Sequence, residues 1–290
     1  MSNESNPHSF TTNKPVDPST IQVLRALVPV AADLDCPFFV AGATARDLVL
    51  VNVYGLRPGR ATRDIDLGIA VESWDVFRSL KERLAATGQF VADSKMQQRL
   101  VYNDDTAGFS IPVDLIPFRG VTSENQTIEW PPGREIILNV AGFEAAWVSS
   151  MLVEIEEGFA VRVASVPGLA LLKLIAWVDR RVENNKDAAD LYRLFSTYAD
   201  AGNFDRLYDQ ELILLEATGF DLELAGAELL GRDVARICTA QILKQAGAWL
   251  RAPKLLDQLV SQMVQTSSHS EAVAEVSRIV NSFCRGFLGL

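Results

Sequence analysis

The stretch TRDIDLGI, residues 62–69, decides how this chain folds. It sets two carboxylates, Asp64 and Asp66, between a basic residue and an apolar run that is typical of a buried β-strand. Side chains two residues apart on a strand point to the same face, with their Cα atoms roughly 6–7 Å apart. Two carboxylates that project together repel each other unless a cation or a proton intervenes. The stretch therefore predicts a strand that begins beside a cation site, although an Asp-x-Asp pair by itself also suits a solvated strand end.

A third carboxylate with similar surroundings lies downstream. Asp114 stands in the apolar run FSIPVDLIPF, residues 109–118, which also reads as a strand. Hard divalent cations such as Mg²⁺ prefer oxygen ligands and bring phosphates with them. Three strand-borne aspartates around a metal form a minimal site for phosphoryl transfer. We predict that Asp64, Asp66 and Asp114 are both the metal ligands and the catalytic residues.

A glycine turn precedes these carboxylates. Residues 36–50, CPFFVAGATARDLVL, read as a strand, a tight turn and a helix, with Gly42 at the turn. Glycine permits a backbone path that a Cβ atom would obstruct, and Ala43 leaves room for another group. The Thr44 hydroxyl near a helix N-terminus suits a phosphate. A plain strand-to-helix turn with Thr44 as its N-cap is the competing interpretation.

A charged motif interrupts the helical second half. Lys173 falls in an apolar helix predicted over residues 167–179, where an ammonium group needs water or an anion. Lys186, Asp187 and Asp190 open the next predicted helix, and the two aspartates share a face. The lysines could contact a triphosphate while the aspartates orient them. An exposed charged helix start is the alternative.

Together these motifs resemble the catalytic core of the DNA polymerase β-like nucleotidyltransferase superfamily over about residues 36–195. The branch they resemble is the nucleotidyltransferase toxins of abortive-infection, type IV toxin–antitoxin systems, which show a Gly-Gly-Thr-Ala-like turn, a Lys/Arg-Asp-Ile-Asp pair and a later Lys…Lys-Asp-x-x-Asp-Leu motif. Here Ala43 replaces the second glycine. The run RDL, residues 46–48, is instead similar to the Gly-Gly-x-Val-Arg-Asp signature of tRNA nucleotidyltransferases and poly(A) polymerases, so the branch and the acceptor stay open.

The resemblance implies an Mg²⁺-dependent (or Mn²⁺-dependent) transfer of a nucleoside monophosphate from an NTP to a hydroxyl of an RNA, such as tRNA, or of a protein. It also implies a toxin with a cognate antitoxin protein and a part in phage defence. The nucleotide-binding residues that it implies are Gly42, Ala43, Thr44, Arg46, Arg63, Lys173, Lys186, Asp187 and Asp190. The alternatives are a nucleotidyltransferase for a small molecule, such as an antibiotic, and an inactive nucleotide-binding or interaction module.

Composition and pattern set the architecture. The chain has 290 residues, 48% of them hydrophobic, and a formal net charge of −10. Such an acidic protein is a poor general binder of duplex nucleic acid, although Arg46, Arg57, Arg60 and Arg63 cluster near the predicted site. We predict an α+β fold: a disordered tail over 1–18, a catalytic domain with a mixed sheet and flanking helices over 19–165, and a helical domain over 166–290, with one helix over 231–250.

Location and cofactor class follow from the remaining composition. Three cysteines without C-x-x-C spacing and two histidines in polar stretches argue against a zinc site or a disulfide framework. No apolar run is long enough to cross a membrane and no leader is evident, so we expect a cytoplasmic protein without a membrane partner.

Overall fold

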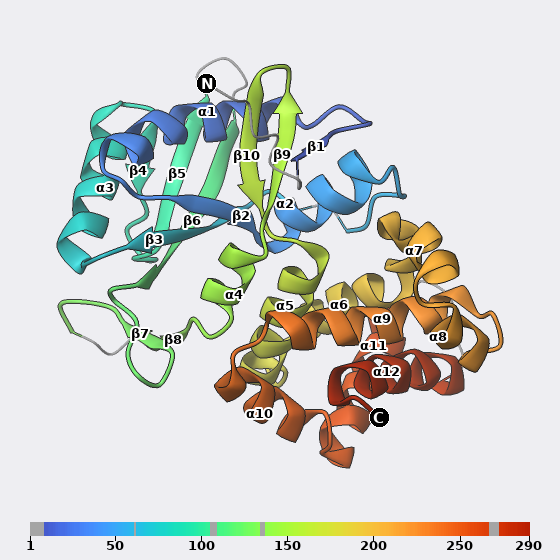
Figure 1. Ribbon diagram of the computed structural model, residues 1–290. Helices are drawn as coiled ribbons and strands as arrows, with labels where there is room; N and C mark the ends of the chain where they lie inside the picture. The colour runs from blue at the N-terminus through green and yellow to red at the C-terminus, as the bar shows by residue number, and fades with distance from the viewer. Residues whose placement is uncertain (1–8, 61, 105–108, 134–136, 267–272) are drawn as a thin grey trace, which may run out of the picture. The chain divides into compact units, whose positions relative to one another are not determined.

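The computed structural model describes residues 9–60, 62–104, 109–133, 137–266 and 273–290. The chain forms two compact units, Met1–Ala164 and Ser165–Leu290. The first unit contains the β-sheets and the second is helical (Figure 1). This is the predicted α+β fold, a mixed sheet with flanking helices followed by a helical region, and the prediction of fold class is confirmed.

The first unit is built on an eight-stranded mixed sheet with the strand order β1-β9-β10-β2-β3-β6-β5-β4. Its strands are β1 (Ser9–Thr11), β2 (Phe38–Ala41), β3 (Ile65–Val71), β4 (Phe90–Ala92), β5 (Arg99–Asp104), β6 (Phe109–Arg119), β9 (Met151–Glu156) and β10 (Phe159–Val163). A separate two-stranded sheet pairs β7 (Thr127–Glu129) with β8 (Ile137–Asn139).

Strand β3 lies near the centre of this sheet, antiparallel to β2 and parallel to β6. Six of its seven residues are buried, so it reads as a continuous apolar run, as a strand covered on both faces should. Gly68 is needed within it because a Cβ there would lie 2.3 Å from the ring of Phe39. That ring in turn packs edge-on against Phe118, 5.9 Å away. The strand that begins at the Asp-x-Asp pair is thereby fixed in the core.

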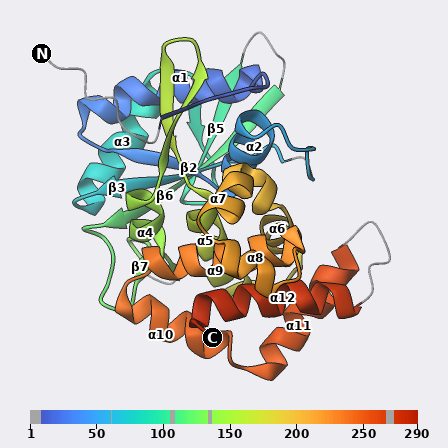
Figure 2. The ribbon, with the colours of Figure 1, turned by 45° about the vertical axis from the view of Figure 1, so that its right-hand side comes forward.

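Four helical segments accompany the sheet: α1 (Pro18–Asp33), α2 (Gly42–Asp47) with its π-helical continuation η1 (Leu48–Val53), α3 (Trp74–Ala86) and α4 (Phe143–Val148). Side chains cap two of them, because the Asp17 carboxylate accepts from two amides of the first turn of α1 and the Ser73 hydroxyl accepts from Val76 N of α3. Helices α1 and α3 lie side by side, as Figures 1 and 2 both show.

The tail prediction was wrong for residues 9–18. Strand β1 pairs in parallel with β9, with Phe10 opposite Val153, and α1 begins at Pro18. Backbone pairing supplies the stabilisation that the polar composition of this segment does not reveal. Residues 1–8, which the same prediction included, lie outside the described residues.

The second unit consists of packed helices: α5 (Val166–Arg180), α6 (Lys186–Thr197), η2 (Ala199–Asn203), α7 (Phe204–Asp209), α8 (Leu212–Ala217), α9 (Leu222–Ile237), α10 (Ala240–Trp249), α11 (Pro253–Thr266) and α12 (Val273–Leu288). The predicted single helix over 231–250 is wrong, because α9 ends at Ile237 and α10 starts at Ala240. Cys238 has extended backbone geometry, and the Thr239 hydroxyl caps α10 by accepting from Ile242 N.

Helices α9 and α12 form the centre of this unit and lie side by side in both views (Figures 1 and 2). Two glycines let their backbones approach closely. A Cβ on Gly231 would lie 2.2 Å from the carbonyl oxygen of Phe283, and one on Gly286 would lie 1.9 Å from that of Glu228. Stacking of Phe195 of α6 on Phe283, with ring centroids 4.1 Å apart, adds a third helix to the core.

Among the helices within the described residues, none combines the length and the apolar character that crossing a membrane requires.

Candidate active site

A row of residues across four neighbouring strands forms the centre of the site. Ala41 at the end of β2 lies opposite Asp66 of β3, Asp66 opposite Asp114 of β6, and Asp114 opposite Arg99 of β5. Residues directly opposite each other on paired strands project to the same face of the sheet. The register therefore brings Asp66 and Asp114 together, although 48 positions separate them in the sequence.

Asp64 completes an acidic cluster. It directly precedes β3, two residues before Asp66, and one carboxylate oxygen from each of Asp64, Asp66 and Asp114 lies within 4.8 Å of the other two. Asp114 is buried and the other two carboxylates are half-buried. Such crowding of like charges is favourable only with a cation or a proton among them. The spatial convergence that the sequence predicted is therefore present.

Arg99, which the sequence analysis did not single out, grips one member of the cluster. Its Nε donates to Asp114 Oδ1 at 2.8 Å and its Nη2 to Oδ2 at 2.7 Å. This is the two-pronged geometry in which guanidinium and carboxylate match best. The hydrogen bonds to Asp114 raise the pKa of Arg99. Arg99 therefore fixes the orientation of the Asp114 carboxylate.

Gly42 makes the close packing of the cluster possible. Its φ of +62° is a backbone conformation that favours glycine, and a Cβ there would lie only 1.8 Å from Asp66 Oδ2. The glycine turn predicted from the sequence is present, between β2 and α2. Because Gly42 has no side chain, the Asp66 carboxylate has space next to the turn. A group that binds at this turn would therefore lie beside that carboxylate.

Two threonines position Asp64. The Thr44 hydroxyl donates to the Asp64 carbonyl oxygen at 3.0 Å, and the Thr62 hydroxyl bonds Asp64 Oδ1. Burial raises the pKa of Asp64, but the bonds from Thr62 and from its own backbone, with Arg99 and Arg60 nearby, outweigh burial, so the pKa lies below its usual value. Asp64 is thus held as a carboxylate. Thr44 does not act as an N-cap, because α2 starts at Gly42 without a side-chain cap.

Arg46 and Arg63, both predicted to contact nucleotide, occupy different environments. Arg46 is only 2% exposed, and its guanidinium donates to Asp47 Oδ1 and to the carbonyl oxygen of Arg60, each at 2.9 Å. It therefore supports the loop that precedes Asp64 from within. Arg57, Arg60 and Arg63 are exposed on that loop, and Arg60 lies near enough to Asp64 to help lower the pKa of that carboxyl group.

The predicted lysine and aspartate motif forms an ion cluster inside the helical unit. Lys173 Nζ lies 3.1 Å from Asp187 Oδ1 and 2.6 Å from Asp190 Oδ2, and Arg180 Nε lies 2.8 Å from Asp187 Oδ2. The side chains of Lys173, Asp187 and Asp190 are 14%, 3% and 6% exposed. Lys186, by contrast, is exposed at the start of α6.

The charges of this second cluster stabilise one another. Burial lowers the pKa of Lys173, but Asp190 and Asp187 outweigh it and the pKa lies above its ordinary value. Burial raises the pKa of Asp187, but the bond from Arg180 and the charge of Lys173 outweigh that effect and the pKa is lowered. Lys173 and Asp187 are therefore held in their charged forms, and the Lys173 ammonium contacts both carboxylates. The geometry favours a structural role for Lys173.

Comparison with protein families gives one match. The family model described as Nucleotidyl transferase AbiEii toxin, Type IV TA system, matches residues 25–247. No curated protein matches the chain.

Solved structures give matches at low identity. An antigenic nucleotidyltransferase-like protein from Paracoccidioides brasiliensis is 14% identical with a TM-score of 0.42, and the match covers 70% of this chain and 94% of that one. ANT(2″)-Ia in complex with adenylyl-2″-tobramycin is 16% identical with a TM-score of 0.37, over 69% of this chain and 96% of that one. A CCA-adding enzyme with ATP is 14% identical with a TM-score of 0.32, over 92% and 70% respectively.

Proposed function

The chain belongs to the AbiEii toxin family of nucleotidyltransferases from type IV toxin–antitoxin systems, and on that premise we propose that it transfers a nucleoside monophosphate from an NTP to a hydroxyl of an RNA acceptor. The observation that carries this proposal is the convergence of Asp64, Asp66 and Asp114 within 4.8 Å beside the Gly42 turn. Three carboxylates brought together where β3 begins beside β6 favour a cation among them, and a nucleotide supplies phosphates for that cation to bind.

The residues of the cluster fit a magnesium or manganese ion. All three offer carboxylate oxygens, which hard divalent cations prefer over nitrogen or sulfur. Asp64, Asp66 and Asp114 would hold the ion. When bound, Mg²⁺ or Mn²⁺ would neutralise the triphosphate and lower the pKa of the attacking hydroxyl.

The chain's own groups would position the reactants. The turn at Gly42, Ala43 and Thr44 would hold the phosphates, because it adjoins the Asp66 carboxylate and its small side chains leave room. Asp114, oriented by Arg99, would lie nearest the acceptor hydroxyl. Catalysis would then rest on positioning and on charge neutralisation, as in other phosphoryl transfers.

The choice of an RNA acceptor is supported by the charge of the loop before Asp64. Exposed Arg57, Arg60 and Arg63 suit a polyanion, and they oppose a polycationic small molecule such as an aminoglycoside. A protein acceptor, the other class that the resemblance implies, is an outcome that the labelling test distinguishes from RNA. The roles that follow from the family, a toxin in the cytoplasm with a cognate antitoxin and a part in phage defence, belong to the same proposal.

The contacts divide the predicted nucleotide-binding residues. Arg63 and Lys186 are exposed and keep that role in the proposal. Arg46, Lys173, Asp187 and Asp190 are engaged in internal contacts that favour support of the loop and of the helical unit instead.

The test is to incubate the purified protein with each α-³²P-labelled NTP, Mg²⁺ and a cell extract. We expect label in RNA, and no label with the Asp66→Ala variant. Label in a protein band or in a small molecule would contradict the RNA assignment, and no label in any fraction would contradict the transfer itself. Growth arrest on expression of the wild type, but not of Asp66→Ala, would test the toxin role.

A further inference from the structure

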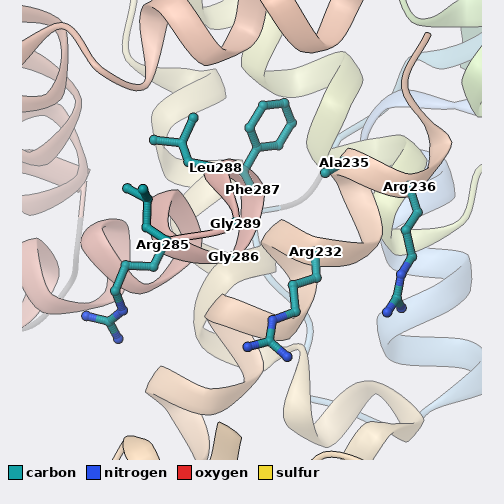
Figure 3. Close-up of a pocket in the computed structure, with 9 residues that line it drawn as sticks. Arg232, Ala235, Arg236, Arg285, Gly286, Phe287, Leu288 and Gly289 are labelled. Carbon is teal, nitrogen blue, oxygen red and sulfur yellow. The ribbon is translucent and has the colours of Figure 1, made fainter. Parts of the chain in front are cut away.

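The helical unit has another charged region, apart from the cluster of Lys173, Asp187 and Asp190. It is a pocket of about 480 Å³ between the C-terminal part of α9 and the end of α12. Three of the residues that line it are arginines, Arg232 and Arg236 from α9 and Arg285 from α12, and none of the described residues that line it has an acidic side chain. Figure 3 shows the three guanidinium groups in a row on one side, while Phe287 and Leu288 project the other way.

Buried carboxylates hold these guanidinium groups from behind. The two oxygens of Glu228, whose side chain is 8% exposed, accept from Arg232 Nη2 at 3.1 Å and from Arg285 Nε at 3.2 Å. Asp233 Oδ1 accepts from Arg236 Nη1 at 2.7 Å. The arginine side chains themselves are 37%, 45% and 61% exposed, for Arg232, Arg285 and Arg236 in turn. Their heads are thus fixed in place and still reach the solvent.

The close approach of the two helices explains why the arginines meet. Gly231 and Gly286, which pack backbone against backbone, each adjoin one of the arginines in sequence. Because the backbones nearly touch there, Arg232 and Arg285 reach the same carboxylate from opposite helices. Arg236 follows Arg232 by four residues and therefore lies on the same face of α9.

Among the side chains of the described ion pairs, guanidinium groups outnumber carboxylates. Four guanidinium groups share three carboxylates in the described ion pairs, namely Arg206, Arg232, Arg236 and Arg285 with Glu211, Glu228 and Asp233. Each arginine that lines the pocket also keeps N–H groups that these pairs do not use, because a guanidinium has five. The remaining donors and the surplus charge suit phosphate oxygens.

We propose that this arginine pocket binds the phosphodiester backbone of the RNA acceptor. The inference rests on the proposed function for the choice of RNA. A row of exposed guanidinium groups in an open pocket fits an extended chain of phosphates, whereas a single small anion would contact only part of the row. Guanidinium groups bind phosphate oxygens through paired hydrogen bonds, and such contacts give affinity without reading the base sequence.

The test is binding of a fluorescein-labelled single-stranded RNA, followed by anisotropy at several salt concentrations without NTP or divalent metal. The variant is Arg236→Gln, which removes one exposed guanidinium and leaves Asp233 bonded to Arg206 and Tyr198. The matched control is Arg278→Gln on α12, because Arg278 is equally exposed, at 62%, and also has one carboxylate partner, Asp221.

We expect Arg236→Gln to weaken RNA binding about fivefold and to reduce the slope of log K against log salt by about 0.7, the value for one lost contact with a single strand. Arg278→Gln should change neither the affinity nor the slope. Arg285→Lys keeps the positive charge but loses the paired N–H donors of the guanidinium group, so its RNA affinity should lie between those of the wild type and Arg236→Gln. Equal affinity and slope for Arg236→Gln and the wild type would overturn the proposal. Equal losses of RNA affinity in Arg236→Gln and Arg278→Gln would also overturn it, because they would show that the affinity depends on the overall charge of the protein and not on this pocket.

Inorganic phosphate and an acidic peptide serve as competitors in the same assay. If either displaces the RNA in the wild type at lower concentration than unlabelled RNA does, the pocket prefers another anion and the RNA assignment is wrong. Because the assay contains no NTP, failure of nucleotidyl transfer would leave its result unchanged, and the two proposals can fail separately.

Discussion

Two clusters of charged side chains, one in each unit of the chain, use the same residue types in opposite ways. In the sheet unit, carboxylates meet one another: Asp64, Asp66 and Asp114 converge within 4.8 Å. In the helical unit, carboxylates meet cations: Asp187 and Asp190 surround Lys173, and Arg180 takes the remaining oxygen of Asp187. Both clusters come from motifs that the sequence resemblance places at one nucleotide site.

The difference indicates what each cluster can do. In a buried cluster of paired opposite charges, each charge is already compensated by its partner, so a charged ligand would add little favourable interaction energy. In the sheet cluster Arg99 bonds Asp114, but three carboxylates still lie within 4.8 Å of one another, an arrangement that favours a further cation among them. The sheet cluster is therefore the candidate for metal and nucleotide, and the helical cluster is a candidate for stabilising its unit.

The largest expected effect separates activity from stability at Asp66. Asp66→Asn should lower the rate of nucleotidyl transfer by about a thousandfold, roughly 4 kcal/mol in activation free energy. The free energy of unfolding should stay the same or rise, because one repelling carboxylate is lost. Transfer is measured with labelled NTP, and unfolding with urea. A folded variant with unchanged turnover would remove Asp66 from the mechanism.

At Lys173 we expect the opposite result, a loss of stability. Lys173→Met removes the ammonium group that Asp187 and Asp190 share, while Arg180 still holds Asp187, and breaking this buried ion pair should lower the free energy of unfolding by about 3–5 kcal/mol. Lys186→Met, the matched exposed lysine of the same motif, should change it by less than about 0.5 kcal/mol. Hydrogen exchange of peptides from α6 would locate the loss. If Lys173→Met kept the free energy of unfolding of the wild type and lost only NTP affinity, measured by calorimetry, the structural role of Lys173 would be wrong.

Arg99 should affect catalysis without acting as a metal ligand. Arg99→Gln frees the Asp114 carboxylate to rotate, and loss of such an orienting contact should lower kcat about tenfold. Metal affinity should not weaken, because a neighbouring positive charge is removed. Arg99→Lys should recover little, since it cannot form the two-pronged contact. Unchanged kcat in Arg99→Gln would make the contact purely structural.

The smallest expected effect is on pH dependence. The folded-state pKa of Asp187 is lowered, so its stabilising contribution is present above its unfolded pKa and is lost as the pH falls through the folded value. The free energy of unfolding should therefore fall as the pH drops below roughly 4, the unfolded-state pKa of an aspartate, on account of this group. Urea titrations at several pH values should show a shallower fall for Asp187→Asn; an identical fall would assign the loss elsewhere.

Much of the fold follows from local pattern. The strand after Asp64 and the turn at Gly42 were predicted from the apolar run and from glycine placement. The break at Cys238 between α9 and α10 was not, because no proline or glycine marks it and the Thr239 cap resembles any exposed threonine. Strand β1 was missed because its pairing with β9 is a contact between distant segments.

The site shows the same division between local and distant information. Asp64 and Asp66 are visible as a local pair, and Asp114 as an aspartate within an apolar run. Arg99 depends on the register of the β5–β6 hairpin. A hairpin centred on the polar run NDDTAG, residues 103–108 of the sequence, would pair Arg99 with Pro112, whereas the observed partner of Arg99 is Asp114. The closed pairing around Lys173 likewise required the packing of α5 on α6, which periodicity alone cannot supply.

Titration of Mn²⁺ into the wild type, Asp66→Asn and Asp187→Asn, followed by calorimetry without nucleotide, tests the central claim most directly. The account predicts Mn²⁺ binding to the wild type and to folded Asp187→Asn, and its loss in Asp66→Asn. Equal Mn²⁺ binding by the wild type and Asp66→Asn, or loss of binding in Asp187→Asn alone, would contradict it.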